Sequence, residues 1–476
     1  MLFNTLAFLT FLPIVFVVYW LLARKKLNYQ NTWLLATSYV FYGWWDYRFL
    51  GLIIATTMVD FIVGIQLQKH KTKRVRKQLL WVSIVFNLCV LGFFKYYNFF
   101  IESWASLLGS VGYGFSNTWT LKVILPIGIS FYTFQTMSYT IDVYRKKIKP
   151  TKDLIAFAGF VAFFPQLVAG PIERATNLLP QILKKRRFNS NQATQGLRLI
   201  LWGMFKKVVV ADNLAPMVDD IFANYTEFNG GMLWLGAIYF SFQIYCDFSG
   251  YSDIAIGTAK LFGVELHSNF KFPYLSRNIG EFWRRWHVSL STWFRDYLYI
   301  PMGGSRSSRW KSVGNIMVLF LVSGLWHGAK ATFVAWGFFH AIIYTVSFLA
   351  QTNRKYVGSI VGQDKFLPSF KEAAQITATF LLITIGFVIF RSESVWDAGY
   401  YIQGLFGNIR IPQQMRVGIL AVGVVYVIEY FFRHDERTVL LAKSKTTRRF
   451  LYVILLTAIL FSFFKTQQTE FIYFQF

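Results

Sequence analysis

The sequence predicts an all-α protein that crosses a lipid bilayer many times, and its composition is the first reason. Hydrophobic residues make up 55% of the 476 residues and charged residues only 15%. Several long stretches contain no charged side chain, and a helix needs about 20 mainly apolar residues to cross the hydrocarbon core. Helices are expected because lipid cannot satisfy an open strand edge. By length, the apolar stretches give about 11 or 12 spans. We find no internal repeat, so we expect a single membrane domain over residues 1–476.

Apolar runs place the individual spans. Residues 2–23 lack a preceding basic region and are followed by Arg24, Lys25 and Lys26, so we expect a retained span and not a cleaved signal peptide. The other predicted spans are residues 31–45, 50–68, 80–100, 121–141, 197–211, 231–246, 313–329, 331–349, 373–390, 417–432 and 450–464.

The net charge of +26 comes from basic clusters between the apolar runs. If the N-terminus lies outside and the spans alternate, the clusters 24–26, 69–77 and 145–149 all face the cytosol, as basic loops do. Membrane topology and anionic headgroups therefore explain the charge, and we expect a lipid bilayer as partner and no nucleic acid.

Residues 154–172 break this alternation. A full crossing there would place the basic cluster 184–187 outside, but Pro165, Gly170 and Pro171 interrupt a helix. The pattern predicts a re-entrant segment. Because broken backbone at membrane depth must line protein or water, it also predicts a cavity near residues 164–174.

His327 ends a charge-free run and lies between Gly324 and Gly328. Ionisable residues within a membrane are functional candidates, because burying them is costly. Burial disfavours the imidazolium, so the ring would be neutral and able to accept a proton. The alternative is a core histidine that is hydrogen-bonded between helices. His340, on a Phe-rich run, is expected to be a packed core residue.

His287 lies in the Trp- and Arg-rich stretch 281–297. If this stretch is one helix, Trp283, His287, Ser291 and Phe294 share a stripe. Such a helix could anchor the protein at the headgroups or carry a catalytic histidine.

Few other polar residues suggest a chemical role. Asp247 and Asp253 follow an apolar run and could orient an imidazole or cap helices, and for Asp253 we expect capping. Cys89 and Cys246 are expected to be buried, and no metal motif, phosphate loop or Ser-His-Asp signature is present.

Two blocks resemble the signature of the membrane-bound O-acyltransferase superfamily. Residues 281–304, with FWRRWH and STWFRDYLYI, resemble its bacterial branch of alginate and peptidoglycan O-acetyltransferase membrane subunits. Residues 324–329, GLWHGA, resemble the second histidine block. Gln166 departs from the alginate-type pattern, which has histidine there. The resemblance reaches about Arg391, and residues 392–476 are less specific. Shorter matches are FLP at 11–13, YGWW at 42–45, LPIGISFYTF at 125–134, AGP at 169–171 and DFSGYSD at 247–253.

The resemblance implies a ring of tilted helices around a central funnel, in the cytoplasmic membrane of a bacterium. It implies that His327 is catalytic and that His287 is the second essential position. The implied reaction is O-acetylation of an extracytoplasmic polysaccharide with cytosolic acetyl-CoA, without a metal or a tightly bound cofactor. Arg284, Arg285 and Lys330 are candidates for contacts with the donor phosphates, or else for membrane anchoring.

The family's relatives also imply a partner, a serine-hydrolase-like acetyltransferase outside the membrane. Tyr113, Phe115 and Trp119 are the predicted contacts with it, unless they only sit in the interfacial aromatic belt. Two alternatives remain at this point. One is D-alanyl transfer to teichoic acid from a carrier protein. The other is a polysaccharide or lipid transporter, which is disfavoured because the sequence lacks paired halves.

Overall fold

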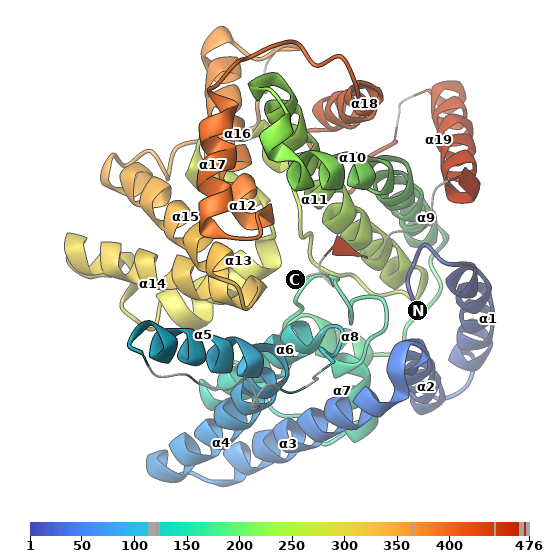
Figure 1. The fold of residues 1–476 in the computed structure, drawn as a ribbon. Coiled ribbons are helices and arrows are strands. Elements are labelled where there is room, and N and C mark those ends of the chain that lie inside the picture. Colours follow the sequence, from blue (N-terminus) through green and yellow to red (C-terminus); the bar gives the residue numbers. More distant parts are fainter. Residues whose placement is uncertain (113–120, 122–123, 364, 442–443, 466–470, 473–476) are drawn as a thin grey trace. The chain divides into compact units, whose positions relative to one another are not determined.

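The computed structural model describes residues 1–112, 121, 124–363, 365–441, 444–465 and 471–472 (Figure 1). Throughout these residues the regular structure is helical and no strand occurs, which confirms the predicted all-α class. The predicted partner contacts Tyr113, Phe115 and Trp119 lie outside the described residues.

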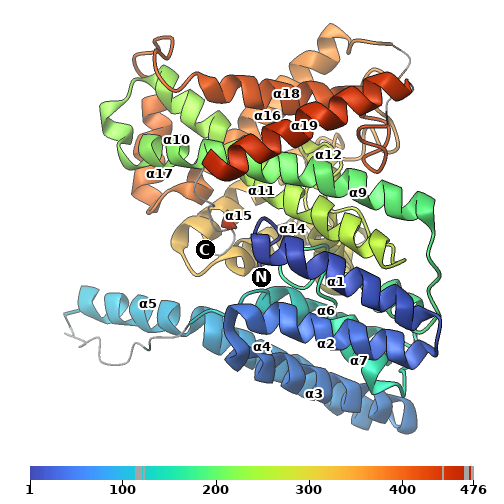
Figure 2. The same cartoon turned by 90° about the vertical axis from the view of Figure 1, so that its right-hand side faces the viewer.

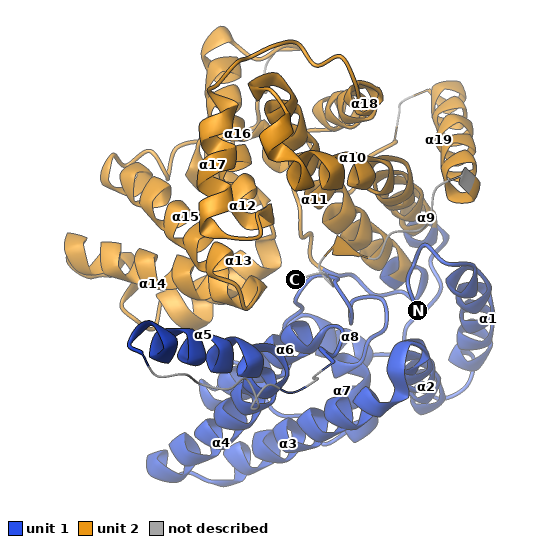
Figure 3. Ribbon diagram, in the orientation of Figure 1, with its two compact units in different colours: residues 1–193, 259–266 blue, residues 194–258, 267–476 orange. Residues whose placement is uncertain are grey.

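The chain divides into two compact units (Figure 3). The first unit comprises residues 1–193 and 259–266, and the second comprises residues 194–258 and 267–476. His287, His327 and His340 all belong to the second unit.

In the first unit, the nearly fully buried helix α6 packs against α3, α4 and α7 (Figure 2). The Arg76 side chain donates a hydrogen bond of 2.7 Å to the carbonyl of Tyr144, the last residue of α6. This bond satisfies a carbonyl that has no partner within the helix. The helices of this unit are α1 (Leu6–Ala23), α2 (Leu27–Asp46), α3 (Leu50–Lys69), α4 (Lys73–Leu91), α5 (Tyr97–Ser110), α6 (Ile129–Tyr144), α7 (Leu154–Val161) and α8 (Leu178–Ile182).

The predicted break in residues 154–172 is present. Helix α7 ends at Val161, and residues 162–173 are buried without forming a helix. The ring of Phe164 packs 5.5 Å from Phe11 and 5.6 Å from Phe262. The depth of this segment in the membrane and the cavity near residues 164–174 stay predictions.

The second unit holds most of the long helix α11, up to residue 258, and the two antiparallel neighbours α14 and α15. Its helices are α9 (Ser190–Met204), α10 (Asp212–Ala223), α11 (Gly230–Leu261), α12 (Ile279–Arg285), α13 (Val288–Phe294), α14 (Arg309–His327), α15 (Ala331–Leu349), α16 (Phe370–Arg391), α17 (Val395–Leu405), α18 (Val417–Phe431) and α19 (Lys445–Lys465). A π-helical segment, η3 (Phe205–Ala211), connects α9 to α10.

Six helical segments of the described chain are long and apolar enough to cross a membrane: α1, α2 with α3, α4 with α5, α15, α16 and α19. The protein is therefore a multi-pass membrane protein. The remaining predicted spans fall on shorter or more polar helices, among them α6, α14 and α18. The count of 11 or 12 stays a prediction.

The topology can be tested by thiol labelling in intact cells. The native cysteines must first be replaced, because Cys89 is exposed. Single cysteines at the exposed Lys26, Lys71 and Lys146 are expected to resist a membrane-impermeant thiol reagent, because basic loops stay in the cytosol. A cysteine at the exposed Ser106, in the predicted external segment, should react. Labelling at any of the three lysine positions would overturn the predicted orientation.

Candidate active site

Glycines let α14 and α15 approach closely. A Cβ atom on Gly324 would collide with the carbonyl oxygen of Phe333, and one on Gly337 would collide with that of Phe320. A Cβ atom on Gly328 would enter the ring of Phe333. Small residues at such crossings bring two backbones together. The last residue of α14, His327, is thereby held against α15.

His327 lies in an aromatic cage. Its side chain is buried, and its ring centroid is 5.0 Å from Trp336 of α15 and 5.4 Å from Phe390 of α16. Trp326, its neighbour in the chain, lies 5.1 Å away. These contacts bury the imidazole of His327 between α14, α15 and α16.

His287 interrupts the helix predicted over residues 281–297. Helix α12 ends at Arg285, His287 has the left-handed backbone angles φ 42° and ψ 53°, and α13 begins at Val288. Residues 281–297 are therefore not one helix, and the stripe that a continuous helix would have formed is absent. A residue other than glycine rarely adopts these angles, which cost about 1–3 kcal/mol and persist only where the surroundings impose them.

Asn269 imposes the conformation at His287. Its backbone carbonyl accepts the N–H of Val288 at 2.8 Å, and its Oδ1 atom lies 3.3 Å from the N–H of Ser289. A backbone N–H can only donate, so this contact fixes which side-chain atom of Asn269 is oxygen. The same Oδ1 lies 3.1 Å from Nδ1 of His287. Since Oδ1 only accepts, Nδ1 carries the proton of the neutral ring and Nε2 carries the lone pair.

The ring of Trp326 lies between the two histidines that were predicted to be catalytic. Its ring lies 5.9 Å from the ring of His287 and 5.1 Å from the ring of His327. His287 is itself buried against Phe248 at 4.7 Å and lies outside the helices that are long enough to cross a membrane. Burial lowers the pKa of His287 to about 3, so the imidazole is neutral at physiological pH. The structure thus brings the two histidines together, one on each side of the ring of Trp326.

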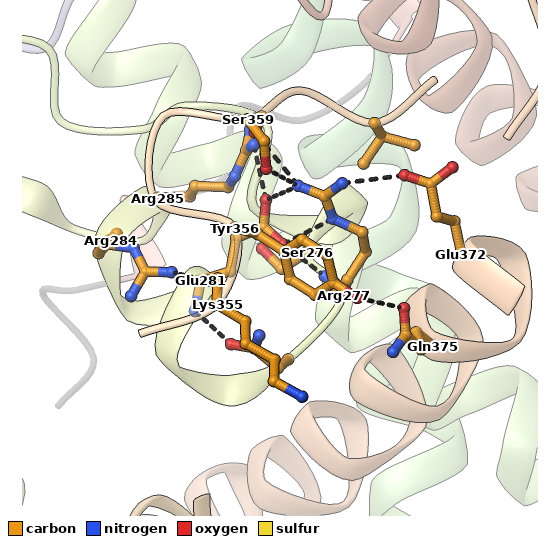
Figure 4. Close-up of polar contacts among 12 residues, drawn as sticks. Ser276, Arg277, Glu281, Arg284, Arg285, Lys355, Tyr356, Ser359, Glu372 and Gln375 are labelled. Carbon is orange, nitrogen blue, oxygen red and sulfur yellow. Dashed lines mark hydrogen bonds and ion pairs between the residues drawn. The ribbon is translucent and has the colours of Figure 1, made fainter. Parts of the chain in front are cut away.

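The three basic candidates occupy different environments. Arg284 donates to the carbonyls of Asn353 at 2.6 Å and Lys355 at 2.9 Å (Figure 4). Arg285 forms an ion pair of 2.8 Å with Glu281. Lys330 is exposed at the start of α15, three residues after His327. Both guanidinium groups thus already bind protein atoms, and the contacts of all three residues with a donor stay predictions.

His340 is a packed core residue, as predicted. It is fully buried, and its ring lies 4.6 Å from Trp336 and 5.1 Å from Trp283. Of the cysteines, Cys246 is buried as predicted, whereas the expectation for Cys89 is wrong because this residue is exposed. The described residues contain no cluster of histidine, cysteine and acidic side chains that could hold a metal ion.

Two buried lysines form ion pairs that the sequence analysis missed. Lys206 Nζ lies 2.6 Å from Asp253, and Lys207 Nζ lies 2.8 Å from Asp247. Both aspartates lie within α11, so the predicted capping role of Asp253 is wrong. A signal was present, since adjacent lysines within the predicted span 197–211 are ionisable residues at membrane depth.

The helical fold and the long apolar segments define a multi-pass membrane protein, in which His287 and His327 lie buried on either side of Trp326. The model of the membrane-bound O-acyltransferase family matches residues 74–354, more than half of the chain. The protein belongs to this family and is an O-acyltransferase. The transporter alternative is thereby excluded.

Relatives from several bacteria resemble the chain over much of its length. A protein of Pseudomonas syringae pv. tomato named probable alginate O-acetylase AlgI is 39% identical over 433 residues, which cover 90% of this chain and 80% of that protein. The peptidoglycan O-acetyltransferase of Helicobacter pylori is 33% identical over 436 residues, covering 86% and 80%. The teichoic acid D-alanyltransferase of Bacillus subtilis is 29% identical over 286 residues, covering 57% and 70%.

Proposed function

We propose that this enzyme takes the acetyl group of acetyl-CoA and delivers it for O-acetylation of a polysaccharide outside the cell. The main support is the similarity to a relative named alginate O-acetylase, which extends over 90% of this chain. The similarity to the D-alanyltransferase extends over 57%, so acetyl transfer is favoured over D-alanyl transfer.

His327 acts as the general base. An alcohol oxygen attacks the carbonyl carbon of the acetyl thioester, and His327 accepts the hydroxyl proton as the new C–O bond forms. The tetrahedral oxyanion then collapses and the C–S bond breaks. The departing thiolate takes the proton from the imidazolium, which restores neutral His327 and releases the CoA thiol. The burial of His327 against Trp336 supports this role, because burial in general favours the uncharged form of an imidazole, which can accept a proton.

His287 acts as an acceptor near the same reaction centre. With the proton on Nδ1 directed at Asn269, its Nε2 atom has a lone pair and no hydrogen. Neutral His287 can therefore share the alcohol proton or accept a hydrogen bond from the attacking hydroxyl. It cannot donate to the oxyanion unless it is protonated, and its burial opposes protonation.

Lys330 is the best candidate for a contact with the CoA phosphates. Its ammonium group is exposed and lies three residues from His327 in the chain. Arg284 and Arg285 form hydrogen bonds and an ion pair within the protein, so they support the site from within.

The enzyme works in the cytoplasmic membrane of a bacterium. From there the acetyl group passes to an extracytoplasmic partner of the serine-hydrolase type. Acetyl-CoA is made in the cytosol, whereas the polysaccharide acceptor is outside. A hydrated polymer would reach the buried histidines only at a large desolvation cost, but an acetyl group faces no such barrier. A serine of the partner would accept the acetyl group as an ester and then transfer it to the sugar hydroxyl.

Reconstitution in lipid vesicles tests the relay. With acetyl-CoA, alginate as acceptor and no second protein, we expect no acetyl ester on the polymer. Adding the soluble extracytoplasmic fraction of the source cells should restore ester formation, and the His327→Gln protein with the same fraction is the negative control. Efficient esterification by the purified protein alone would refute the relay. Turnover with a D-alanyl carrier-protein thioester, and not with acetyl-CoA, would support D-alanyl transfer instead.

A further inference from the structure

Helix α12 leads directly into His287 but has only seven residues, Ile279–Arg285. An isolated helix of this length is not stable in water, so side-chain contacts must fix its position. We propose that a buried ion network made by Arg277, Glu281 and Glu372 positions His287 for acyl transfer. This inference rests on the proposed role of His287.

Glu281, within α12, is the centre of the network. Its Oε2 atom accepts hydrogen bonds from the backbone N–H and the Nε of Arg277, at 2.9 Å and 3.1 Å (Figure 4). Its Oε1 atom accepts from Arg277 and Arg285, at 3.1 Å and 2.8 Å. The Arg277 and Glu281 side chains are 3% and 2% exposed. Removing the carboxylate of Glu281 would leave the buried Arg277 with Glu372 as its acidic partner in the network, so the arrangement is constrained by buried charge.

Arg277 extends the network to two other parts of the chain. It forms an ion pair of 2.9 Å with Glu372, in the first turn of α16, and donates to the Ser359 hydroxyl at 2.8 Å. Its guanidinium also lies 3.8 Å from the ring centroid of Tyr356. One side chain thus links α12, the segment 352–359 and the start of α16.

The segment 352–359 is held directly against α12. Asn278 caps α12 through the N–H of Glu281 and donates to the carbonyl of Thr352 at 3.2 Å. Arg284 binds the carbonyls of Asn353 and Lys355, and a Cβ atom on Gly280 would collide with the backbone of Asn353. The segment follows α15, the helix whose Trp336 contacts His327. The network therefore sets the position of α12 relative to the helix beside the proposed base.

A displacement of α12 would be passed on to His287. The N–H of Trp286 donates to the carbonyl of Phe282 at 2.8 Å, and the two rings stack at 5.5 Å. His287 follows at once in its strained conformation, and Asn269 holds it from the other side. Misplacement of a reacting group by about 1 Å can lower the rate about 100-fold.

Glu281→Gln tests the proposal in reconstituted vesicles that contain acetyl-CoA, alginate and the soluble extracytoplasmic fraction, with ester formation on the polymer as the measured reaction. Gln keeps the size of the side chain but removes the charge that pairs with Arg277. We expect kcat to fall about 10- to 100-fold while KM for acetyl-CoA stays within about twofold, because only the reacting geometry changes. Glu372→Gln should give a smaller loss, since Glu372 is 22% exposed and Arg277 keeps Glu281. The matched control is Glu393→Gln, at an exposed residue, which should behave like wild type.

Non-additivity separates positioning from a general loss of structure. Asn269→Ala and Glu281→Gln loosen His287 from opposite sides, so the double variant should lose less activity than the product of the two single losses. A multiplicative double loss, or a wild-type kcat for Glu281→Gln, would refute the positioning role. If Glu281→Gln does not fold, the same cycle with Glu372→Gln decides the question. Wild-type activity of His287→Ala would instead refute the proposed role of His287, whatever the Glu281 variants do.

Discussion

Replacing His327 with glutamine is expected to abolish acyl transfer, with a loss of about 1000-fold or more. Glutamine has a similar size and can form hydrogen bonds, but it cannot take a proton from an attacking alcohol. The close crossing of α14 and α15 is set by Gly324 and Gly337, which the substitution leaves unchanged, so the variant should fold normally. The measurements are the ester content of the extracellular polymer and the release of CoA thiol in vesicles, both at matched protein amounts.

A matched substitution controls for the loss of any histidine. His70 is exposed at the end of α3, and His70→Gln should retain wild-type activity. His327→Ala should fail as His327→Gln does. If either His327 variant acetylates the polymer at the wild-type rate, His327 is not the base.

Changing the partner of His287 should alter the pH dependence of the reaction. In the wild-type protein, burial lowers the pKa of His287 to about 3, so this ring stays neutral across the working range. In Asn269→Asp, a carboxylate beside Nδ1 favours the imidazolium and raises the pKa of His287. A raised pKa means that the ring is protonated as the pH falls, and a protonated ring cannot accept. Acyl transfer by Asn269→Asp should therefore decline at a higher pH than wild type as the solution is acidified.

Two further variants define the size and the cause of this effect. His287→Ala should lower kcat about 100-fold or more, in the range that acid–base groups contribute. Asn269→Ala removes the side-chain carbonyl that contacts His287 without adding a charge. This variant should have a lower kcat, but its activity should not decline at a higher pH than that of the wild type. Identical pH profiles for Asn269→Asp and wild type would show that His287 does not take part in the proton transfer.

The sequence was sufficient to predict the helix that ends at His327. A charge-free run with closely spaced glycines predicted the helix that ends there, and α14 ends at His327 itself. The sequence around His287 was misleading, because residues 281–297 contain no glycine or proline to signal a break. The break is imposed by Asn269, 18 residues away in the chain, through tertiary hydrogen bonds. Local pattern cannot predict such a contact.

The buried ion pairs were hidden for a similar reason. Lys206 and Lys207 are separated from Asp253 and Asp247 by at least 40 residues, and only the packing of η3 against α11 joins them. The Arg277 network is partly local, since Arg277 and Glu281 are one helical turn apart, but Glu372 is 95 residues from Arg277. The spacing of Arg277 and Glu281 is compatible with an ion pair, but nothing in the sequence indicates that this pair is joined to the start of α16.

The lysine–aspartate pairs also place a requirement on how the protein enters the membrane during synthesis. A lone lysine at the centre of an inserted helix costs about 2.5–3.5 kcal/mol, and η3 carries two adjacent ones. Lys207 also forms an ion pair of 2.9 Å with Asp212, only five residues later, whereas the ion-pair partner of Lys206 is Asp253 of α11. Asp253 is made 47 residues after Lys206, which is about 2 to 9 seconds at translation rates of about 5–20 residues per second. Until then Lys206 has no neutralising carboxylate from α11. We therefore expect α9 and α11 to enter the membrane together, and replacing Asp253 should impair membrane integration of a segment that is synthesised earlier.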